Sequence, residues 1–403
     1  MRILWVKAGG VWPLTSGGRL LSFNTISQLS QRHQVSVVTS HGPGESPHEV
    51  RGQLPHCERV ELFAHAPPKR GTRRFAVSLA RSWLSPLPVD LWKWRLPRLR
   101  EGVAELLEED DFDVCVADSL TAMPNVPWPC PVPLVLSQQN VEHMLWKRLG
   151  RVVPSWQRAL VELESRKTRR YEARACARAT LTIAVSQADR DRLRAISPGA
   201  TVCAVPSGVD TAYFAPRGEL EVPGRLVFTG SMDWYPNEDA VRHFIDAILP
   251  AIRRGAPHTT VSIVGRDPSS RLRATAARAD VQVTGTVADV RPYVGQAEVF
   301  VVPLRIGGGT RLKILEGLAM GKAVVSTTTG AEGLPLVPGT HLLQADDPLE
   351  FARAVVALLR EPRRRSALGV AGRRLVREYS WAEVGRDFEA RCAQAAGLDP
   401  RGG

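Results

Sequence analysis

Residues 299–333 combine residue types that could bind phosphate. An apolar run at 299–304 leads into a loop with three glycines and a threonine: Gly307, Gly308, Gly309 and Thr310. Glycines that adopt positive φ let successive backbone N–H groups curl around an anion. Thr310 is a good N-cap residue, so the following helix should direct its partial positive charge toward the same anion. This order of strand, loop and helix predicts a phosphate site.

Charged residues at the start of that helix extend the prediction. Arg311 and Lys313 oppose the helix dipole unless an anion is bound there. Glu316 follows Lys313 by three residues and shares its face, so its carboxylate could accept hydrogen bonds from sugar hydroxyls. Phosphate, cation and hydroxyl acceptor together suggest a nucleotide sugar. A glycine-rich turn with an ion pair on its surface is the simpler alternative.

The composition restricts the class of protein. A chain of 403 residues with 44% hydrophobic and 23% charged residues suits two globular domains. Its net charge of +12 fits phosphorylated substrates, an anionic membrane surface or nucleic acid. Nucleic acid is the weakest of these, because no zinc-finger spacing or RNA-binding aromatic signature is present. High arginine content is also consistent with a genomic composition bias.

Cysteine usage and hydropathy predict a cytoplasmic protein. The six cysteines are scattered without a C-x-x-C pair, which argues against a disulfide framework or structural zinc. The N-terminus at 1–18 reads as a first strand and a glycine-rich turn, not as a signal peptide. No run approaches the roughly 18 apolar residues of a membrane span. Any membrane contact should therefore be peripheral, on the inner face of the cell membrane.

Strand and helix patterns alternate in both halves of the chain, which predicts an α/β fold with two doubly wound domains. Strands are expected at 2–6, 33–40, 112–119, 131–140, 181–185, 225–231, 259–265, 281–287, 299–304 and 322–327. A Pro- and Gly-rich stretch at 205–224 suits a linker. The predicted domains are therefore 1–205 and 206–378, followed by a helix and tail at 379–403 that return to the first domain.

Two segments of the first half are rich in cations. The segment 69–102 mixes Lys and Arg with Trp83, Trp92 and Trp94, as surface helices at a lipid interface often do. A helical insertion with packed tryptophans is an equal alternative, because prolines interrupt the apolar stripe. The segment 147–178 is arginine-rich and is expected to be a helix with a solvated face.

Motifs over nearly the whole chain resemble the retaining family 4 glycosyltransferases of the GT-B fold. The matching pieces are Ser16-Gly17-Gly18-Arg19, QNVE (139–142), AVSQADR (184–190), VPSGVD (205–210), LVFTGSMDWYPNEDAV (226–241), the segment 299–333 and YSW (379–381). The resemblance implies two Rossmann-like domains that face each other across a cleft. The second domain would bind a UDP- or GDP-sugar, and the first would bind a lipid-linked, polysaccharide or other glycan acceptor.

The resemblance also implies roles for particular residues. Glu316 would hold the donor ribose, Gly308, Gly309 and Thr310 would face the diphosphate, and Arg311 and Lys313 would neutralise it. The remaining donor-binding candidates are Ser231, Gly307 and Leu315. Gly17, Gly18 and Arg19 would approach the donor from the opposite side, and the acceptor-side candidates are Asp118, Asn140, Glu142 and His143. Asp118 could equally cap a helix, and His143 could be an ordinary loop histidine.

The chain departs from the family pattern at three places. Many members carry a second glutamate eight residues before Glu316, where this chain has Gly308. Many also have an Arg and a Lys after the strand at 225–231, whereas this chain has Asp233, Trp234 and Asn237. Arg311 and Lys313 are the candidates to replace them. Relatives often have His in place of Gln139.

The sequence contains no Asp-x-Asp motif for a diphosphate-bound metal, so we expect catalysis without a metal or other cofactor. Fixed dipoles and cations could stabilise the leaving diphosphate instead. Two other functions stay open at this stage. One is a nucleotide-sugar 2-epimerase of the same fold, and the other is a catalytically silent nucleotide-sugar-binding scaffold.

Overall fold

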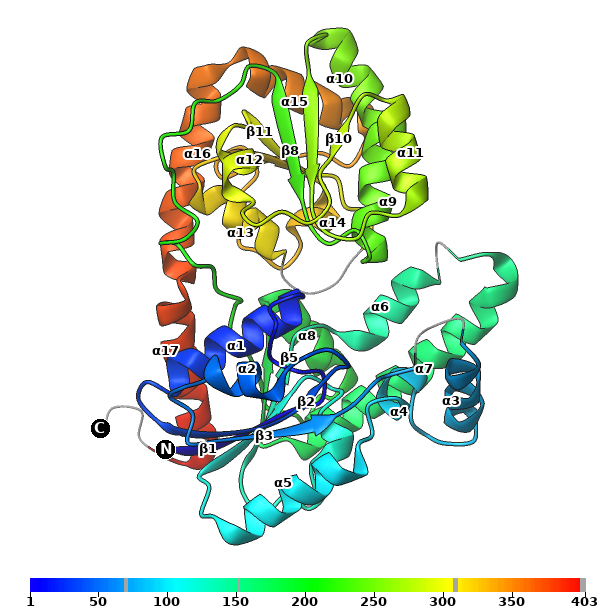
Figure 1. The fold of residues 1–403 in the computed structure, drawn as a ribbon, viewed down its shortest axis with the longest axis vertical. Helices are drawn as coiled ribbons and strands as arrows, with labels where there is room; N and C mark the ends of the chain where they lie inside the picture. The colour runs from blue at the N-terminus through cyan, green and yellow to red at the C-terminus, as the bar shows by residue number, and fades with distance from the viewer. Residues whose placement is uncertain (69–71, 151–152, 307–310, 399–403) are drawn as a thin grey trace. The chain divides into compact units, whose positions relative to one another are not determined.

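The computed structural model describes residues 1–68, 72–150, 153–306 and 311–398, and it divides into two compact units. The first unit combines Met1–Ser207 with Trp381–Gly403, and the second is Gly208–Ser380. Each unit has a parallel sheet covered by helices (Figure 1). The predicted α/β class with two parallel sheets is confirmed.

The sheet of the first unit has the strand order β3-β2-β1-β4-β5-β6-β7. Its strands are β1 (Arg2–Lys7), β2 (Gln34–His41), β3 (Arg59–Ala64), β4 (Val114–Asp118), β5 (Leu134–Gln138), β6 (Leu181–Ala184) and β7 (Val202–Ala204). Alternate residues of β1 enter two different cores: Leu4 and Val6 pack on one face of the sheet, Ile3 and Trp5 on the other. Because both faces are covered, the central strands are mostly buried and mainly apolar.

The helices of the first unit lie in the crossover connections and at the chain's C-terminal end. They are α1 (Gly17–Leu29), α2 (Pro47–Gly52), α3 (Arg73–Trp83), α4 (Val89–Trp92), α5 (Pro97–Glu109), η1 (Met123–Asn125), α6 (Glu142–Leu149), α7 (Ser155–Arg178), α8 (Gln187–Ile196) and α17 (Trp381–Ala396). The segment 69–102 thus forms α3, α4 and the start of α5 within its described part. Trp92 and Trp94 are only partly exposed, whereas Trp83 is exposed.

Helix α17 belongs to the first unit although it comes last in the chain. It runs beside α1 (Figure 1, red beside dark blue). Phe388 of α17 contacts Trp5 of β1, with 5.5 Å between the ring centroids, and Val384 and Cys392 enter the same core. The helix therefore covers one face of the first sheet.

The second unit has the strand order β10-β9-β8-β11-β12-β13. Its strands are β8 (Arg225–Thr229), β9 (Thr260–Val264), β10 (Gln282–Val283), β11 (Val299–Val302), β12 (Ala323–Ser326) and β13 (Leu343–Gln344). The chain order reverses between β8 and β11, so the carboxyl ends of these two strands flank a topological switch point. Ligands of open α/β sheets bind at such points.

Helices cover both faces of the second sheet, and alternate residues of its strands again enter two cores. The helices are α9 (Tyr235–His243), the π-helical turn η2 (Phe244–Ile248), α10 (Leu249–Gly255), α11 (Ser270–Arg278), α12 (Arg291–Gly295), α13 (Leu312–Ala319), α14 (Thr328–Ala331), α15 (Pro348–Arg360), α16 (Pro362–Val376) and η3 (Arg377–Tyr379).

We expect Phe388→Ala to destabilise the first unit by about 3–5 kcal/mol, because it removes a ring that is only 4% exposed and leaves a cavity against Trp5. Arg386→Ala on an exposed face of the same helix is the control and should cost less than about 0.5 kcal/mol. Urea unfolding followed separately for the two transitions would measure both changes. Equal effects of the two substitutions would contradict the packing of α17 described above.

Candidate functional site

The helix that follows β11 carries the charged residues predicted for the donor. Helix α13 begins at Leu312, and Arg311 occupies its N-cap position without a side-chain capping bond. The predicted N-cap Thr310 is therefore wrong by one residue, within the usual uncertainty of helix ends. Gly307, Gly308, Gly309 and Thr310 lie outside the described residues, so the predicted phosphate loop stays a prediction. Arg311 is buried, and its Nη2 donates to the carbonyl of Thr329 at 3.4 Å.

Lys313 reaches back from α13 toward the end of β8. Its Nζ donates to Oδ1 of Asn237 at 2.8 Å and lies 3.9 Å from the ring centroid of Phe228. The side chain is partly exposed, and its ammonium group lies between the Asn237 amide and the Phe228 ring. Burial lowers the pKa of Lys313 to about 7; Glu316 opposes this shift and Arg311 adds to it. An anion beside Lys313 would restore its charge.

Glu316 stands one turn further along α13. Burial raises its pKa to about 7, and the nearby Lys313 only partly offsets that shift. Within the described part of the chain, its carboxylate accepts no hydrogen bond. Both oxygens therefore keep lone pairs for ligand hydroxyl groups, as a ribose-binding carboxylate requires. The Leu315 side chain, in contrast, is 1% exposed in the core, so only its backbone could take part in donor binding.

Ser231 lies just beyond β8, where it is held by Asn237, which the sequence analysis named without a role, and by Arg266, which it missed. Its Oγ accepts from Nε of Arg266 at 2.8 Å, and its carbonyl accepts from Nδ2 of Asn237 at 2.8 Å. Arg266 also pairs with Asp233 at 3.1 Å. Arg266 follows the carboxyl end of β9, so the rule that ligand-binding residues follow strand ends could have identified it. It places a guanidinium group, paired with Asp233 and Asp267, beside the predicted donor site.

Gly265 allows this loop arrangement. A Cβ atom added to Gly265 would lie 1.8 Å from the carbonyl oxygen of Gly230, which is closer than any side chain permits. The loops after β8 and β9 can therefore meet only if residue 265 has no side chain. In the second unit, Ser231, Asn237, Arg266, Lys313 and Glu316 thus lie at the carboxyl ends of β8, β9 and β11.

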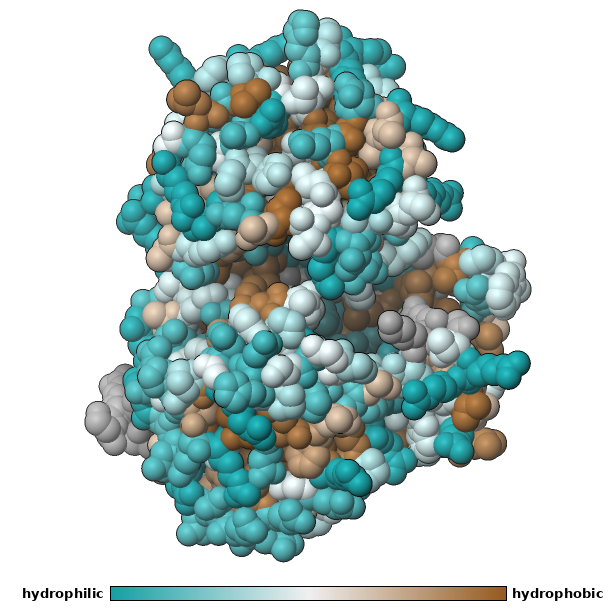
Figure 2. Space-filling view, viewed as in Figure 1, coloured by the Kyte–Doolittle hydropathy of each residue, from teal (hydrophilic) through white to brown (hydrophobic). Residues whose placement is uncertain are grey.

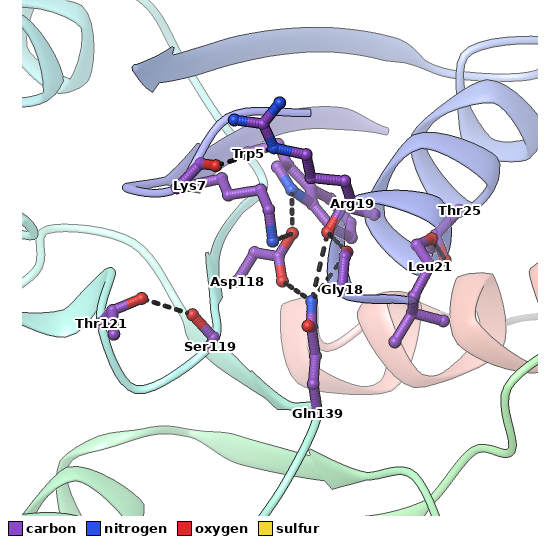
Figure 3. A network of polar contacts seen from close by, with 12 residues as sticks. Trp5, Lys7, Gly18, Arg19, Leu21, Thr25, Asp118, Ser119, Thr121 and Gln139 are labelled. Carbon is purple, nitrogen blue, oxygen red and sulfur yellow. Dashed lines mark hydrogen bonds and ion pairs between the residues drawn. The ribbon is translucent and has the colours of Figure 1, made fainter. Parts of the chain in front are cut away.

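Asp118 is the centre of a buried polar network in the first unit (Figure 3). Its Oδ2 accepts from Nε1 of Trp5 at 3.0 Å and from Nζ of Lys7 at 3.2 Å, and its Oδ1 accepts from Nε2 of Gln139 at 2.7 Å. The same Gln139 amide donates to the carbonyl of Gly18 at 3.3 Å. Asp118 therefore joins the ends of β1, β4 and β5 to α1. It does not cap a helix, and its three donors leave it poorly suited to act as a base.

Arg19 holds the loop that precedes α1. Its guanidinium donates to the carbonyls of Gly9, Trp12 and Pro13 and pairs with Glu45 at 2.6 Å. These partners hold the Nε and Nη1 groups of Arg19 within the first unit, and its approach to the donor stays a prediction. Gly17 is the first residue of α1, behind the N-cap Ser16. At Gly18, a Cβ would lie 2.5 Å from Oε1 of Gln139, so a side chain there would displace the amide.

The acceptor-side candidates after β5 gather around a second buried carboxylate. His143 is buried at the start of α6, and its Nδ1 lies 2.6 Å from Oε2 of the fully buried Glu172. It is therefore a paired helix residue and not a loop histidine. Glu142 follows Asn140 by two residues. Burial, and then the charge of Glu172, raise the pKa of Glu142 to about 8. Glu172 also accepts from the backbone N–H of Glu142 at 2.8 Å.

No group of three or more His, Cys, Asp or Glu side chains suited to a metal ion occurs among the described residues. A search of the same residues also found no helix with the length and apolar character needed to cross a membrane.

Two protein-family models match successive parts of the chain. The model described as Glycosyltransferase Family 4 matches residues 17–213, and the model described as Glycosyl transferases group 1 matches residues 223–361. Together they cover the strands from β2 to β13 and the candidate donor residues of the second unit, whereas β1 precedes the first match.

Curated relatives are mannosyltransferases. The chain is 28% identical over 202 residues to a GDP-mannose-dependent monoacylated alpha-(1-6)-phosphatidylinositol monomannoside mannosyltransferase of Corynebacterium glutamicum. It is 29% identical over 238 residues to a GDP-mannose-dependent alpha-(1-6)-phosphatidylinositol monomannoside mannosyltransferase of Mycolicibacterium smegmatis. These matches take in 45% and 53% of this chain, and 53% and 60% of the two enzymes. A phosphatidyl-myo-inositol mannosyltransferase of Mycobacterium leprae is 25% identical over 353 residues, covering 81% of this chain and 86% of that enzyme.

Solved structures share the fold over nearly the full chain. The sucrose-phosphate synthase of Thermosynechococcus elongatus superposes with a TM-score of 0.75 at 17% identity, covering 98% of both chains. Anabaena Alr3699/HepE, solved with UDP and glucose, gives a TM-score of 0.68 at 15% identity, covering 98% of this chain and 99% of that one. At these identities the likeness concerns the fold, which is GT-B.

We expect Asp118→Ala to destabilise the first unit by about 3–5 kcal/mol, because it leaves the buried Lys7 ammonium without its counter-charge. Adding Lys7→Met should recover a large part of that loss. Asp110→Ala removes a partner of Arg2 from a pair that is about one third exposed, and it should cost at most about 1 kcal/mol. Chemical denaturation would measure all three, and a double variant as unstable as Asp118→Ala alone would rule out this explanation.

Proposed function

This chain belongs to the family 4 glycosyltransferases of the GT-B fold, and on that premise we propose that it transfers a hexose from a nucleotide diphosphate sugar to a lipid-linked acceptor. The observation that carries the proposal is the pair of Lys313 and Glu316 on α13, beside the carboxyl ends of β8 and β11. A cation and a carboxylate that accepts no hydrogen bond from the described residues, both at a topological switch point, suit the diphosphate and the ribose of one ligand.

The names of the relatives limit the choice of donor and acceptor to test first. Both the Corynebacterium and the Mycolicibacterium enzymes are named for GDP-mannose and for a phosphatidylinositol monomannoside. We therefore propose GDP-mannose as the first donor to test, with UDP-glucose as the second because Alr3699/HepE was solved with UDP and glucose. A glycolipid with an exposed sugar hydroxyl is the proposed acceptor.

The proposed reaction proceeds with retention and without a metal ion. The bond between the sugar C1 and the β-phosphate oxygen breaks, and a bond from C1 to the acceptor oxygen forms on the same face. The acceptor hydroxyl gives its proton to the departing phosphate. Protonated Lys313, assisted by Arg311, would neutralise the charge that grows on the diphosphate. Glu316 would hold the nucleotide by its ribose throughout.

A thermal-shift panel of GDP, UDP and ADP tests nucleotide binding. A nucleotide at a hundred times its dissociation constant should stabilise the protein by about 2.7 kcal/mol. Glu316→Ala should abolish most of that shift, whereas Glu383→Ala, an exposed carboxylate on α17, should leave it intact. A panel without any shift, or a shift that survives Glu316→Ala, would contradict the donor site. The product masses from GDP-mannose and a glycolipid then distinguish a transferase from an epimerase. Adding EDTA to the same reaction tests whether it needs a metal ion.

The affinity for the nucleoside diphosphate should be greatest near pH 7. Above the Lys313 pKa of about 7 the ammonium loses its proton, so affinity should fall by up to about tenfold per pH unit. Below the Glu316 pKa of about 7 the carboxylate becomes protonated and loses acceptor capacity, so affinity should also fall toward acid. Calorimetric titrations from pH 5.5 to 9 would give the profile. Lys313→Met should remove its alkaline limb, and an unchanged limb would show that another group titrates.

A further inference from the structure

A buried carboxylate on α7 holds the start of α6. Glu172 is fully buried, and its Oε1 accepts from the backbone N–H of Glu142 at 2.8 Å and from Nε2 of Gln138 at 3.2 Å. Val141, at the N-cap position of α6, makes no side-chain capping bond. Glu172 therefore caps α6 from another helix, and its negative charge suits the positive end of the α6 dipole.

The same carboxylate holds the ring of His143. Oε2 of Glu172 lies 2.6 Å from Nδ1 of His143. The hydroxyl group of Ser165, which is also on α7, donates to the carbonyl of His143 at 3.2 Å. Helix α7 therefore fixes His143 at its ring and at its backbone, and the His143 side chain is only 9% exposed.

The pairing with Glu172 determines which ring nitrogen of His143 is free. A carboxylate ion can only accept hydrogen bonds, so in the neutral imidazole the proton stays on Nδ1 and the lone pair is on Nε2. Among the described residues, Nε2 has no hydrogen-bond partner, and it is not one of the polar atoms that are both unpartnered and shut off from solvent. Nε2 thus reaches solvent with a free lone pair, just beyond the carboxyl end of β5.

The neighbourhood of Glu142, the residue before His143, suits hydroxyl groups better than phosphate. Burial, followed by the charges of Glu172 and Asp90, raises the pKa of Glu142 to about 8. Near neutral pH, the protonated Glu142 carboxyl can both donate to a sugar hydroxyl and accept from it. A phosphate would instead add negative charge beside Asp90 and Glu172. The chemistry of this position therefore favours an uncharged, hydroxyl-bearing ligand.

The rest of α6 adds apolar surface beside these polar groups. Figure 2 shows hydrophobic side chains at the surface near α6. Helix α6 itself contributes Met144, Leu145 and Leu149, all partly exposed. A sugar that is attached to an apolar chain would fit both the polar start of α6 and the apolar residues that follow.

We propose that Nε2 of His143 binds a hydroxyl group on the sugar of the acceptor, and that Glu172 is the positioning residue that fixes the tautomer and the orientation of the His143 ring. The hydroxyl group donates its hydrogen to Nε2 and keeps its O–H bond, because it is not the group that receives the hexose. Glu172 acts only through His143 and touches no substrate. This inference rests on the proposed function, since it assigns part of the acceptor site of that reaction.

Nitrogen NMR of histidine-labelled protein tests the tautomer without any substrate. At about pH 8.5, well above the usual imidazole pKa, the His143 ring should carry its proton on Nδ1, and His143→Gln identifies its signals. Glu172→Gln keeps the size of the side chain but supplies an amide that can donate to Nδ1, so the proton should move largely to Nε2. Glu162→Gln changes an exposed carboxylate on the same helix and should leave the signals unchanged. A wild-type ring with a proton on Nε2, or a tautomer unaffected by Glu172→Gln, would overturn the positioning role.

Steady-state kinetics with GDP-mannose and a glycolipid test the binding of the acceptor. Glu172→Gln and His143→Phe should each raise the KM for the glycolipid by about tenfold, which corresponds to one lost hydrogen bond, and should leave the KM for GDP-mannose unchanged. His143→Gln keeps a carbonyl that accepts the same hydrogen, so it should recover part of the loss. Glu172→Gln combined with His143→Phe should be no worse than His143→Phe alone, because Glu172 acts through His143. Equal rises in both KM values, or additive effects in the double variant, would contradict the proposal.

Acceptor binding can be measured apart from transfer in the wild-type protein. Octyl α-mannoside, a short-chain glycolipid added without any donor, should shift the Nε2 signal of His143. A shifted signal in a protein that transfers no sugar would support the acceptor contact and contradict only the proposed reaction. An active enzyme whose Nε2 signal does not respond to the mannoside would do the reverse. Both measurements use the unmodified chain, so they decide the question even where a variant fails to fold.

Discussion

The constraint on which both units depend is that their central strands are covered on both faces. Such strands carry no charged side chain within their length, because a buried charge needs a partner. In these central strands the charged groups therefore lie at or just beyond the strand ends. Asp118 and Lys7 close their strands in the first sheet, and Ser231 and Arg266 follow theirs in the second.

In the candidate donor site, burial disfavours the charged forms of Lys313 and Glu316. Burial shifts the pKa of Lys313 down and that of Glu316 up, each toward the neutral form of the group. In the first unit, by contrast, the buried carboxylates have hydrogen-bond donors within the protein. Asp118 accepts three hydrogen bonds, and Glu172 is paired with His143 and accepts from a backbone N–H group. Buried polar groups whose hydrogen bonds are all made within the protein stabilise the fold. Groups that lack such partners can form hydrogen bonds with a ligand.

The sequence predicted the fold class and most strands because apolar runs bounded by Gly and Pro are strong signals. It missed β3, β7 and β13, since β3 is only half-buried and the other two have three and two residues. At the candidate donor site, the three-residue spacing of Lys313 and Glu316 correctly predicted that they share one face of a helix. It could not predict that Arg19 is held by Glu45, that Asn237 reaches Lys313, or that Arg266 reaches Ser231. Those contacts join residues that are 26, 76 and 35 positions apart.

The return of α17 to the first unit has a consequence for synthesis of the chain. The core around Trp5 and Val37 is closed by Trp381, Val384 and Phe388, which leave the ribosome after the entire second unit. The first unit can begin to fold early, but one face of its sheet stays uncovered while the second unit is being made. The unit that starts first is therefore the one that finishes last, and its exposed apolar face is a natural binding site for chaperones during translation.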